Sequence, residues 1–358
     1  MDQMEGFALE LEDELMNFSD VSYKSFVKSE SEIITLFYDK FADIPLLSRM
    51  DAVAETFIDE IETLLNRDLP EEERIPLIEK FQKMYETMDF YVLYNRFLKE
   101  EGYQTLPRRP LEKRKLRYED VYPVLYLKYR LSRQAERSNI KHLVIDEMQD
   151  YSRLQYLIIR RMFSCKMTIL GDRAQTMADQ QQDVLQFLPG IFGKDLRRIE
   201  MRKSYRNTVE IASYAANLIG VTDLELFERH GMPVLERDVT DLEAALREAV
   251  DTLFPDEKTY ETAAVIVPDE KTAERAYLIL REILAEKDFD CEKRLSWLNR
   301  DSSSFKKGLT VTTFYLAKGL EFDQVFSIFP KDEKREIMMQ AQYIAATRAL
   351  HELRVYHI

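Results

Sequence analysis

The feature that most constrains the fold is an alternation of short apolar segments with helical segments, which begins near residue 118 and continues to the C-terminus. The apolar segments predict β-strands at residues 141–146, 166–172, 196–201, 263–268, 309–314, 324–329 and 353–358. Periodic apolar residues between them predict helices at 152–163, 207–219, 270–284 and 333–348. Alternation of this kind forms parallel sheets with helices on both faces, and ligands bind where the strands stop. The sequence therefore predicts an α/β fold with its chemistry at the carboxyl ends of buried strands.

Residues 1 to about 100 differ from this pattern, because they contain few β-branched runs and many helical periods. In residues 81–102 the apolar side chains recur three and four positions apart, at Phe81, Met84, Tyr85, Met88, Tyr91, Val92 and Leu98. Gly102 follows as a stop signal, and Pro107 and Pro110 mark a break beyond it. This stretch predicts one amphipathic helix whose aromatic stripe packs into a core.

Length and composition are those of an ordinary globular protein. The 358 residues suffice for two or three domains, and 45% apolar with 32% charged residues is not a disordered composition. No apolar run is long enough to cross a bilayer and the N-terminus is acidic, so we expect a cytoplasmic protein with no membrane partner. Cys165 and Cys291 lack the spacing of a disulfide framework or a zinc site, and we expect both to be reduced core residues.

The net charge limits how the chain can contact nucleic acid. With 51 Lys and Arg against 65 Asp and Glu, the net charge is −14, which argues against binding through diffuse electrostatics alone. A local basic groove remains compatible with this charge. The densest basic segment is 106–117, LPRRPLEKRKLR, which reads either as a solvated linker or as a surface that contacts phosphate.

Acidic side chains follow the predicted strand 141–146 in the stretch HLVIDEMQD. An aspartate in the position of Asp146 can hold Mg²⁺, and the next residue, Glu147, can orient or deprotonate an attacking water. Gln149 and Asp150 add polar groups where a nucleotide phosphate would lie. The alternative reading of this stretch is a solvated strand end or a helix cap.

A second strand, in ILGDRAQ, also ends in an acid, which amide and basic side chains then follow. Gln175 in this stretch could hydrogen-bond a γ-phosphate or its attacking water. The alternative is a polar turn after a strand.

Five segments in order resemble motifs II to VI of superfamily 1 helicases of the UvrD/Rep type: VIDEMQD, LGDRAQ, RKSYRNTVEI at 202–211, TVTTFYLAKGLEFDQV at 310–325 and YIAATRAL at 343–350. Within that group, KSYRN, YLAKGLEFD and YEDVYPVLYLKYRL resemble HelD, the RNA polymerase-associated helicase-like factors of the DNA helicase IV type. The resemblance covers residues 118–358 well and residues 1–117 loosely. It implies RecA-like lobes of the P-loop NTPase kind.

The resemblance implies a site for ATP and Mg²⁺. It places Asp146 and Glu147 at the metal, with Glu147 as catalytic base and Gln175 as γ-phosphate sensor. Arg206 and Arg348 match the two arginines that clamp the γ-phosphate from the second lobe, where a planar guanidinium can donate to two oxygens at once. The other implied nucleotide contacts are Gln149, Tyr205, Gly319 and Glu321.

The same resemblance suggests nucleic-acid contacts at Thr312, Thr313 and Lys318. Tyr315 departs from the pattern, because motif V usually carries a histidine there. This departure puts in doubt the DNA contact that unwinding helicases make at that position.

The largest departure is that the sequence contains no G-x-x-x-x-G-K-[ST] loop, the nest of N–H groups and the lysine that hold the β- and γ-phosphates. In relatives this Walker A loop lies upstream of motif II. We therefore expect a C-terminal portion of a HelD-like protein that binds ATP weakly by itself and that needs a missing N-terminal Walker A segment. The predicted parts are a helical insertion or arm region at 1–117, the C-terminal part of a first RecA-like lobe at 118–200 and a second lobe at 201–358.

Two functions follow from these observations. The first is an ATP-driven helicase-like motor that remodels nucleic acid or RNA polymerase complexes, with DNA, RNA polymerase or both as partners. The second is a non-catalytic helicase-like module that docks on RNA polymerase or DNA through residues 1–117.

Overall fold

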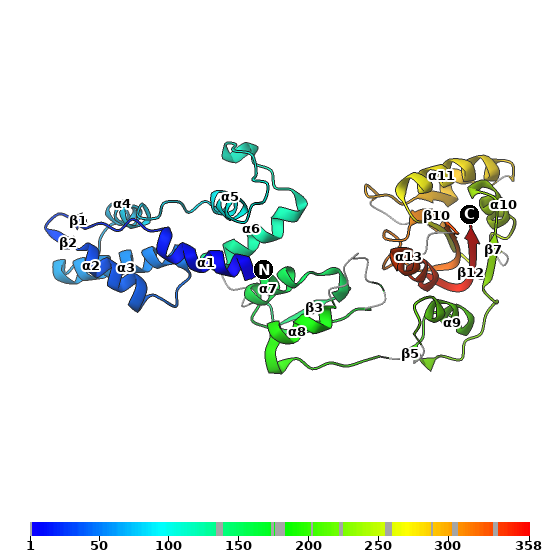
Figure 1. The fold of residues 1–358 in the computed structure, drawn as a ribbon, viewed down its shortest axis with the longest axis horizontal. Coiled ribbons are helices and arrows are strands. Elements are labelled where there is room, and N and C mark those ends of the chain that lie inside the picture. Colours follow the sequence, from blue (N-terminus) through cyan, green and yellow to red (C-terminus); the bar gives the residue numbers. More distant parts are fainter. Residues whose placement is uncertain are drawn as a thin grey trace. The chain divides into compact units, whose positions relative to one another are not determined.

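The chain folds into two compact units (Figure 1). The computed structural model describes residues 2–133, 139–172, 175, 183–201, 203–221, 225–254, 260–287, 289–302, 307–331 and 336–358. Unit 1 comprises Met1–Asp146, Tyr151–Ile169 and Val184–Asp195, and unit 2 comprises Glu147–Asp150, Leu170–Asp183 and Leu196–Ile358. The boundaries predicted at residues 117 and 200 follow motifs rather than contacts, and they stay predictions.

The first part of unit 1 is mainly helical. Its α-helices are α1 (Asp2–Glu14), α2 (Glu30–Thr35), α3 (Arg49–Leu65), α4 (Glu71–Gln82), α5 (Phe90–Glu100) and α6 (Tyr118–Leu131). A short π-helix, η1 (Leu36–Lys40), and two 3-10 helices, η2 (Leu46–Ser48) and η3 (Leu111–Lys113), accompany them. A short antiparallel hairpin joins β1 (Val21–Tyr23) to β2 (Phe26–Lys28). One continuous apolar core runs through these helices and includes Leu11, Phe37, Phe81 and Tyr126, each fully buried.

The single helix predicted over residues 81–102 is wrong, because the chain forms two helices with a break between them. α4 ends at Gln82, and α5 begins only at Phe90, after Asp89 caps it by accepting from the Tyr91 N–H at 2.9 Å. Met84 and Tyr85 lie in the break and are buried there by packing against other segments. The stop at Gly102 is confirmed, since α5 ends at Glu100 and Gly102 has φ +74°.

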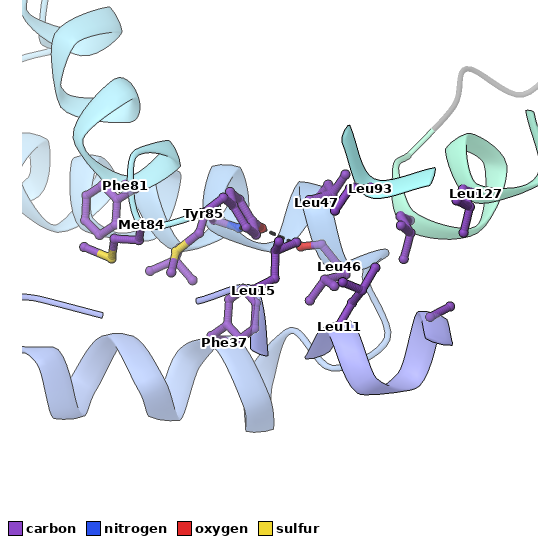
Figure 2. Packing of buried hydrophobic residues seen from close by; sticks show 14 of the residues in the cluster. Leu11, Leu15, Phe37, Leu46, Leu47, Phe81, Met84, Tyr85, Leu93 and Leu127 are labelled. Atoms are coloured by element: carbon purple, nitrogen blue, oxygen red, sulfur yellow. Dashed lines mark hydrogen bonds between the residues drawn. The ribbon is translucent and has the colours of Figure 1, made fainter. Parts of the chain in front are cut away.

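Tyr85 ties the break to the chain before α3. Its hydroxyl donates to the carbonyl of Leu46 and accepts from the N–H of Met50 at 3.3 Å. Figure 2 shows the ring among the buried side chains of Leu15, Phe37 and Leu46, with its hydrogen bonds drawn as dashed lines. Burial raises the pKa of the Tyr85 hydroxyl above its ordinary value, so the group stays a neutral donor.

The second part of unit 1 holds a two-stranded parallel sheet. β3 (His142–Ile145) pairs with β4 (Lys166–Ile169), and α7 (Arg153–Met162), α8 (Val184–Phe192) and η6 (Gly193–Asp195) accompany them. The predicted strands 141–146 and 166–172 are confirmed as strands, but the expected burial of the first is not. Val144 is 61% exposed, because among the described residues β3 pairs only with β4 and one face of the pair stays open.

Unit 2 is built on a six-stranded sheet in the order β7-β12-β11-β8-β10-β9, in which every neighbouring pair is parallel. The strands are β7 (Leu235–Asp238), β8 (Thr262–Val267), β9 (Leu295–Trp297), β10 (Gly308–Thr313), β11 (Phe322–Phe329) and β12 (Ala349–His357). The helices are α9 (Val209–Leu218), α10 (Leu242–Asp251), α11 (Glu270–Ala285), α12 (Cys291–Arg294) and α13 (Glu336–Thr347). A small separate pair joins β5 (Lys203–Ser204) to β6 (Glu225–Leu226).

Alternation along β8 explains how helices cover both faces of this sheet. Ala263, Val265 and Val267 join the core beneath α10 and α11, whereas Ala264 and Ile266 join the core beneath α9 and α13 (Figure 1). Successive strand residues point to opposite faces, so a strand buried on both faces reads as continuously apolar. The predicted α/β fold, a parallel sheet with helices on both faces, is confirmed for unit 2.

The strand predicted at 196–201 is wrong. These residues form no strand, and Ile199 and Met201 are 76% and 85% exposed. A segment this short forms a strand only when it pairs with a second strand. The strand that forms nearby is the two-residue β5, which follows residues 196–201.

We expect Tyr85→Phe to lower the free energy of unfolding of the chain by about 1–2 kcal/mol, because it leaves a buried carbonyl and a buried N–H without their shared partner. Urea denaturation followed by circular dichroism measures the loss. The matched control is Tyr103→Phe, at a ring that is 53% exposed. Equal losses in the two variants would contradict the role given to the Tyr85 hydroxyl.

Candidate functional site

A tight turn directly after β3 sets the position of Glu147. Glu147 has φ +51°, in the left-handed region that a non-glycine residue rarely adopts. Its carbonyl accepts from the N–H of Asp150 at 2.9 Å, and the Met148 N–H donates to the Leu170 carbonyl at 2.8 Å. Asp146, directly before the turn, is exposed and belongs to unit 1, whereas the other predicted site residues lie in unit 2.

Gln149 joins the turn to the chain that follows β4. Its side-chain amide donates to Glu147 Oε2 at 2.6 Å, and its carbonyl oxygen accepts from the Asp172 N–H at 3.1 Å. A Cβ on Gly171 would lie 2.5 Å from Gln149 Oε1, so the position has no room for a side chain. The predicted nucleotide contact Gln149 is thus a buried link between two loops, and its role toward a nucleotide stays a prediction.

Lys318 provides the positive charge for these acids. Its Nζ lies 2.6 Å from Asp150 Oδ1 and 3.5 Å from Glu147 Oε2, and it donates to the Gln175 carbonyl at 3.4 Å. The Lys318 side chain is only 6% exposed. The nucleic-acid contact that the sequence suggested for Lys318 stays a prediction. In this arrangement the Lys318 ammonium compensates the charges of Glu147 and Asp150.

Arg348 is the most deeply buried charge of the group, with 1% of its surface exposed. Its guanidinium donates to Gln175 Oε1 at 3.2 Å, to Thr347 Oγ1 at 3.1 Å, and to the carbonyls of Leu320 and Ile344 at 3.3 and 3.2 Å. Burial first, and then the nearby charge of Arg206, lower the pKa of Arg348 below its usual value. With four hydrogen bonds, the guanidinium holds its own position and orients the Gln175 side chain, which is itself buried.

Tyr343 and Asp172, which were not predicted as site residues, form further hydrogen bonds beside Gln175. Tyr343 donates its hydroxyl to Asp172 Oδ2 at 3.0 Å, and the Gln175 side chain donates to the same oxygen at 3.0 Å. Burial, followed by the Asp172 charge, raises the pKa of Tyr343. Asp172 lies in LGDRAQ and Tyr343 lies in YIAATRAL, so membership of these motifs was the sequence signal that could have identified them.

Arg206 and Glu321 pair with each other. Arg206 Nε lies 2.7 Å from Glu321 Oε1, and both side chains are nearly half exposed. Tyr205, beside Arg206, is 60% exposed and lies against Phe227 with ring centroids 5.6 Å apart. Gly319 has φ +80°, a backbone conformation that glycine adopts without strain and that turns the chain between Lys318 and Glu321.

Thr312 and Thr313, suggested as nucleic-acid contacts, are both buried at the end of β10. Thr312 donates to the Leu298 carbonyl at 3.3 Å, whereas the Thr313 hydroxyl is buried without a hydrogen-bond partner in the part of the chain that the structure describes. Contact with nucleic acid at either residue stays a prediction.

The predicted site residues lie at both ends of the strands, and not only at the carboxyl ends that the sequence predicts. Glu147 and Asp172 follow β3 and β4, as expected. Glu321 and Arg348 directly precede β11 and β12 and so lie at the amino ends of those strands. The reason is that α13 runs into β12 without a loop, so the junction itself carries Arg348.

The backbone of Arg206 is held by the chain that precedes β7. Arg229 donates to the Arg206 carbonyl at 2.7 Å and also to the carbonyl of Leu350. Next to it, Glu210 in the first turn of α9 accepts from the Gly231 N–H at 2.9 Å and lies 2.9 Å from His230 Nδ1. The hydrogen bond with His230, followed by backbone N–H groups, lowers the pKa of Glu210 to about 2.

The donor set fits a metal ion that shares its coordination with a phosphate. Magnesium is usually bound through one or two carboxylates, with substrate phosphates and waters completing its shell. Glu147 and Asp150 already converge on a cation, the Lys318 ammonium, which stands in for such positive charge. The described residues contain no group of three or more His, Cys, Asp and Glu that could hold a metal ion by themselves. The Arg348 guanidinium supplies N–H groups of the kind that phosphoryl oxygens accept.

The sequence matches one known family over part of its length. Residues 8–177 match the UvrD/REP helicase N-terminal domain. Over these residues the match supports the predicted resemblance to UvrD/Rep-type helicases, and it includes the turn at Glu147 and Gln175. A search of curated proteins gives no significant match. No helix in the described ranges has both the length and the apolar character that crossing a membrane requires.

Several solved structures are similar to the chain at low identity. The C-terminal domain of a possible DNA helicase from Lactobacillus plantarum WCFS1 is 24% identical, with 43% of this chain and 88% of that domain covered and a TM-score of 0.33. The PRRSV helicase is 14% identical over 75% of this chain and 45% of its own, with a TM-score of 0.34. The Arterivirus nonstructural protein 10 helicase is 15% identical over 75% and 50%, with a TM-score of 0.33. The chain thus spans about half the length of these two viral helicases.

We expect Lys318→Met to lower the free energy of unfolding by about 1–2 kcal/mol, because it leaves two carboxylates close together without their cation. Added Mg²⁺ should raise the melting temperature of this variant more than that of the unchanged protein, since the ion can replace the lost charge. The control is Lys293→Met, whose exposed pair with Asp290 contributes little. An identical response of both proteins to Mg²⁺ would refute the cation site.

We expect Glu210→Gln to lower stability at neutral pH and to lose this effect in acid. A folded-state pKa below the usual value of 4.5 contributes stability that is present above 4.5 and is lost as the pH falls from there through about 2. Chemical denaturation of both proteins across this range measures the difference. Glu274→Gln, at an exposed position of α11, should show no such pH dependence.

Proposed function

We propose that this chain is part of a HelD-like superfamily 1 protein that hydrolyses ATP with Mg²⁺ and thereby remodels nucleic acid or RNA polymerase complexes. The observation that carries the proposal is that Gln175 links the acidic and the guanidinium groups. Lys318 donates to its carbonyl and binds Asp150, and Arg348 donates to its side chain. A pure scaffold has no physical need to bring these residue types together in one unit.

The roles follow the chemistry of phosphoryl transfer. Asp146 and Glu147 would hold Mg²⁺, and Glu147 would also act as the base for the attacking water. Gln175 senses the γ-phosphate, and Arg206 and Arg348 donate to its oxygens as charge develops there. When it is bound, Mg²⁺ neutralises phosphate charge.

The nucleotide must compete with ion pairs that the protein already makes. Arg206 is paired with Glu321, and the Lys318 ammonium lies on Glu147 and Asp150. Binding at the γ-phosphate end therefore requires Arg206 to leave Glu321 and the metal ion to take over part of the role of Lys318. Glu321, Tyr205, Gly319 and Gln149 are the remaining proposed nucleotide contacts.

The rest of the phosphate cradle is proposed to come from an upstream segment that carries a Walker A loop. The open face of the β3–β4 pair supports this, because Val144 is exposed although parallel sheets are ordinarily covered on both faces. Helices of an upstream segment packed on this face would bury this surface. DNA, RNA polymerase or both are the proposed partners of the whole protein.

The second candidate is a non-catalytic module that docks on RNA polymerase or DNA. The observation in its favour is that Glu147, Asp150, Arg206 and Glu321 are already neutralised within the chain, so the fold needs no nucleotide to compensate these charges. Nucleotide binding separates the two candidates, since the module has no use for it.

The test is ATP turnover of the chain joined to a segment that carries a Walker A loop. Glu147→Gln should reduce turnover by about a thousandfold or more, as should Arg348→Lys, which keeps a buried cation but loses the planar fork. Arg237→Ala, which removes an exposed ion pair with Glu248, is the control and should leave turnover unchanged. Near-normal rates in both site variants, with unchanged melting temperatures, would refute the assignment.

A further inference from the structure

An open cavity of about 290 Å³ lies in unit 1, away from the site described above. Its lining comes entirely from residues 104–117, between α5 and α6. Arg109, Lys115 and Arg117 line it with positive charge, and Leu106 and Pro107 give it an apolar wall. We name this cavity the basic pocket.

The backbone of the basic pocket is anchored to α5. The Leu106 N–H donates to Asn95 Oδ1 at 2.7 Å, and the Tyr91 hydroxyl donates to the Pro107 carbonyl at 2.7 Å. Arg114 stacks on the Tyr91 ring, 4.8 Å from its centroid, and donates to the Arg109 carbonyl at 3.0 Å. These contacts hold the segment in one shape before any ligand arrives, which lowers the entropy cost of binding.

The cations of this segment divide into two classes. Arg114 and Arg117 are paired, with Asp89 at 2.5 Å and with the buried Asp120 at 2.6 Å. Four others are exposed and form no ion pair within the residues that the structure describes: Arg108, Arg109, Lys113 and Lys115. In a chain of net charge −14, unpaired cations gathered on an anchored segment attract an anion.

Exposed apolar and aromatic side chains lie close to these cations in the sequence. Tyr118, at the start of α6, is 80% exposed, and its ring makes an edge contact with Tyr122 at 6.3 Å. Leu111 is 74% exposed. Cations that follow a phosphate backbone beside an exposed ring for base stacking are typical of single-stranded nucleic-acid surfaces, since paired bases in a duplex offer no free face. The volume of the pocket is at the low end for ligand sites and suits one nucleotide unit.

We propose that the basic pocket binds single-stranded nucleic acid, with Arg109 and Lys115 on its phosphates and Tyr118 stacked on a base. The inference rests on the proposed function in that it names where, and in which form, the nucleic acid is held. It does not depend on the nucleotide site, because the binding needs no ATP.

The test measures binding of a labelled oligothymidylate to the full chain by fluorescence anisotropy, without nucleotide. Arg109→Ala with Lys115→Ala should weaken binding by about tenfold at low salt and should flatten the slope of log K against log salt by about 1.4, or about 0.7 for each lost phosphate contact. The charge-matched control, Lys271→Ala with Arg275→Ala on the exposed face of α11, should change neither. Tyr118→Ala should weaken binding by about tenfold, and Tyr118→Phe should not.

Three results would overturn the proposal: unchanged affinity in the pocket variant, equal losses in pocket variant and control, or stronger competition by a polyglutamate peptide than by unlabelled oligothymidylate. The last result would assign the pocket to an acidic protein partner. Glu147→Gln, which disables turnover in the proposed function, should leave oligothymidylate binding unchanged. Failure of the pocket and failure of the ATPase are therefore distinguishable.

Discussion

The structure of unit 2 depends on covering both faces of its parallel sheet. β8 illustrates this requirement, because all but its first residue are buried and its side chains alternate between two separate cores. α13, which covers one face, connects β11 to β12, so its end lies directly before the start of β12, and Arg348 lies at that junction.

Burial makes the charged groups of the site rigid, but their removal from water costs free energy. A guanidinium as deeply buried as that of Arg348 is stable only when its N–H groups are satisfied, and Gln175, Thr347 and two carbonyls satisfy them. The same bonds orient the Gln175 side chain. Lys318 is similarly enclosed and compensates Glu147 and Asp150. Arg348, Gln175 and Lys318 are therefore held in place before a ligand binds.

The two charged regions of the chain work by different physical means. The acids and guanidinium groups of unit 2 are paired with each other, so a ligand gains access only by exchanging partners. Arg109 and Lys115 of the basic pocket form no ion pair within the described residues, so the anion that we propose would bind there without displacing a carboxylate. In the proposed function, the first region would respond to nucleotide and the second would hold nucleic acid between turnovers.

Residue types and local periods in the sequence predicted the strands β8, β10, β11 and β12, the helices α9, α11 and α13, and the motifs that supply the candidate site residues. They failed at 81–102, where the chain forms two helices and the buried side chains of Met84 and Tyr85 lie in the break between them. They also failed at 196–201, where the residues form no strand. Only the tertiary structure decided which charges pair, such as Lys318 with Asp150 and Arg206 with Glu321. Local patterns reflect residues that are near one another in the sequence. These ion pairs join residues that are far apart in the sequence and that only the folded connections between strands bring together, so no short stretch of sequence encodes them.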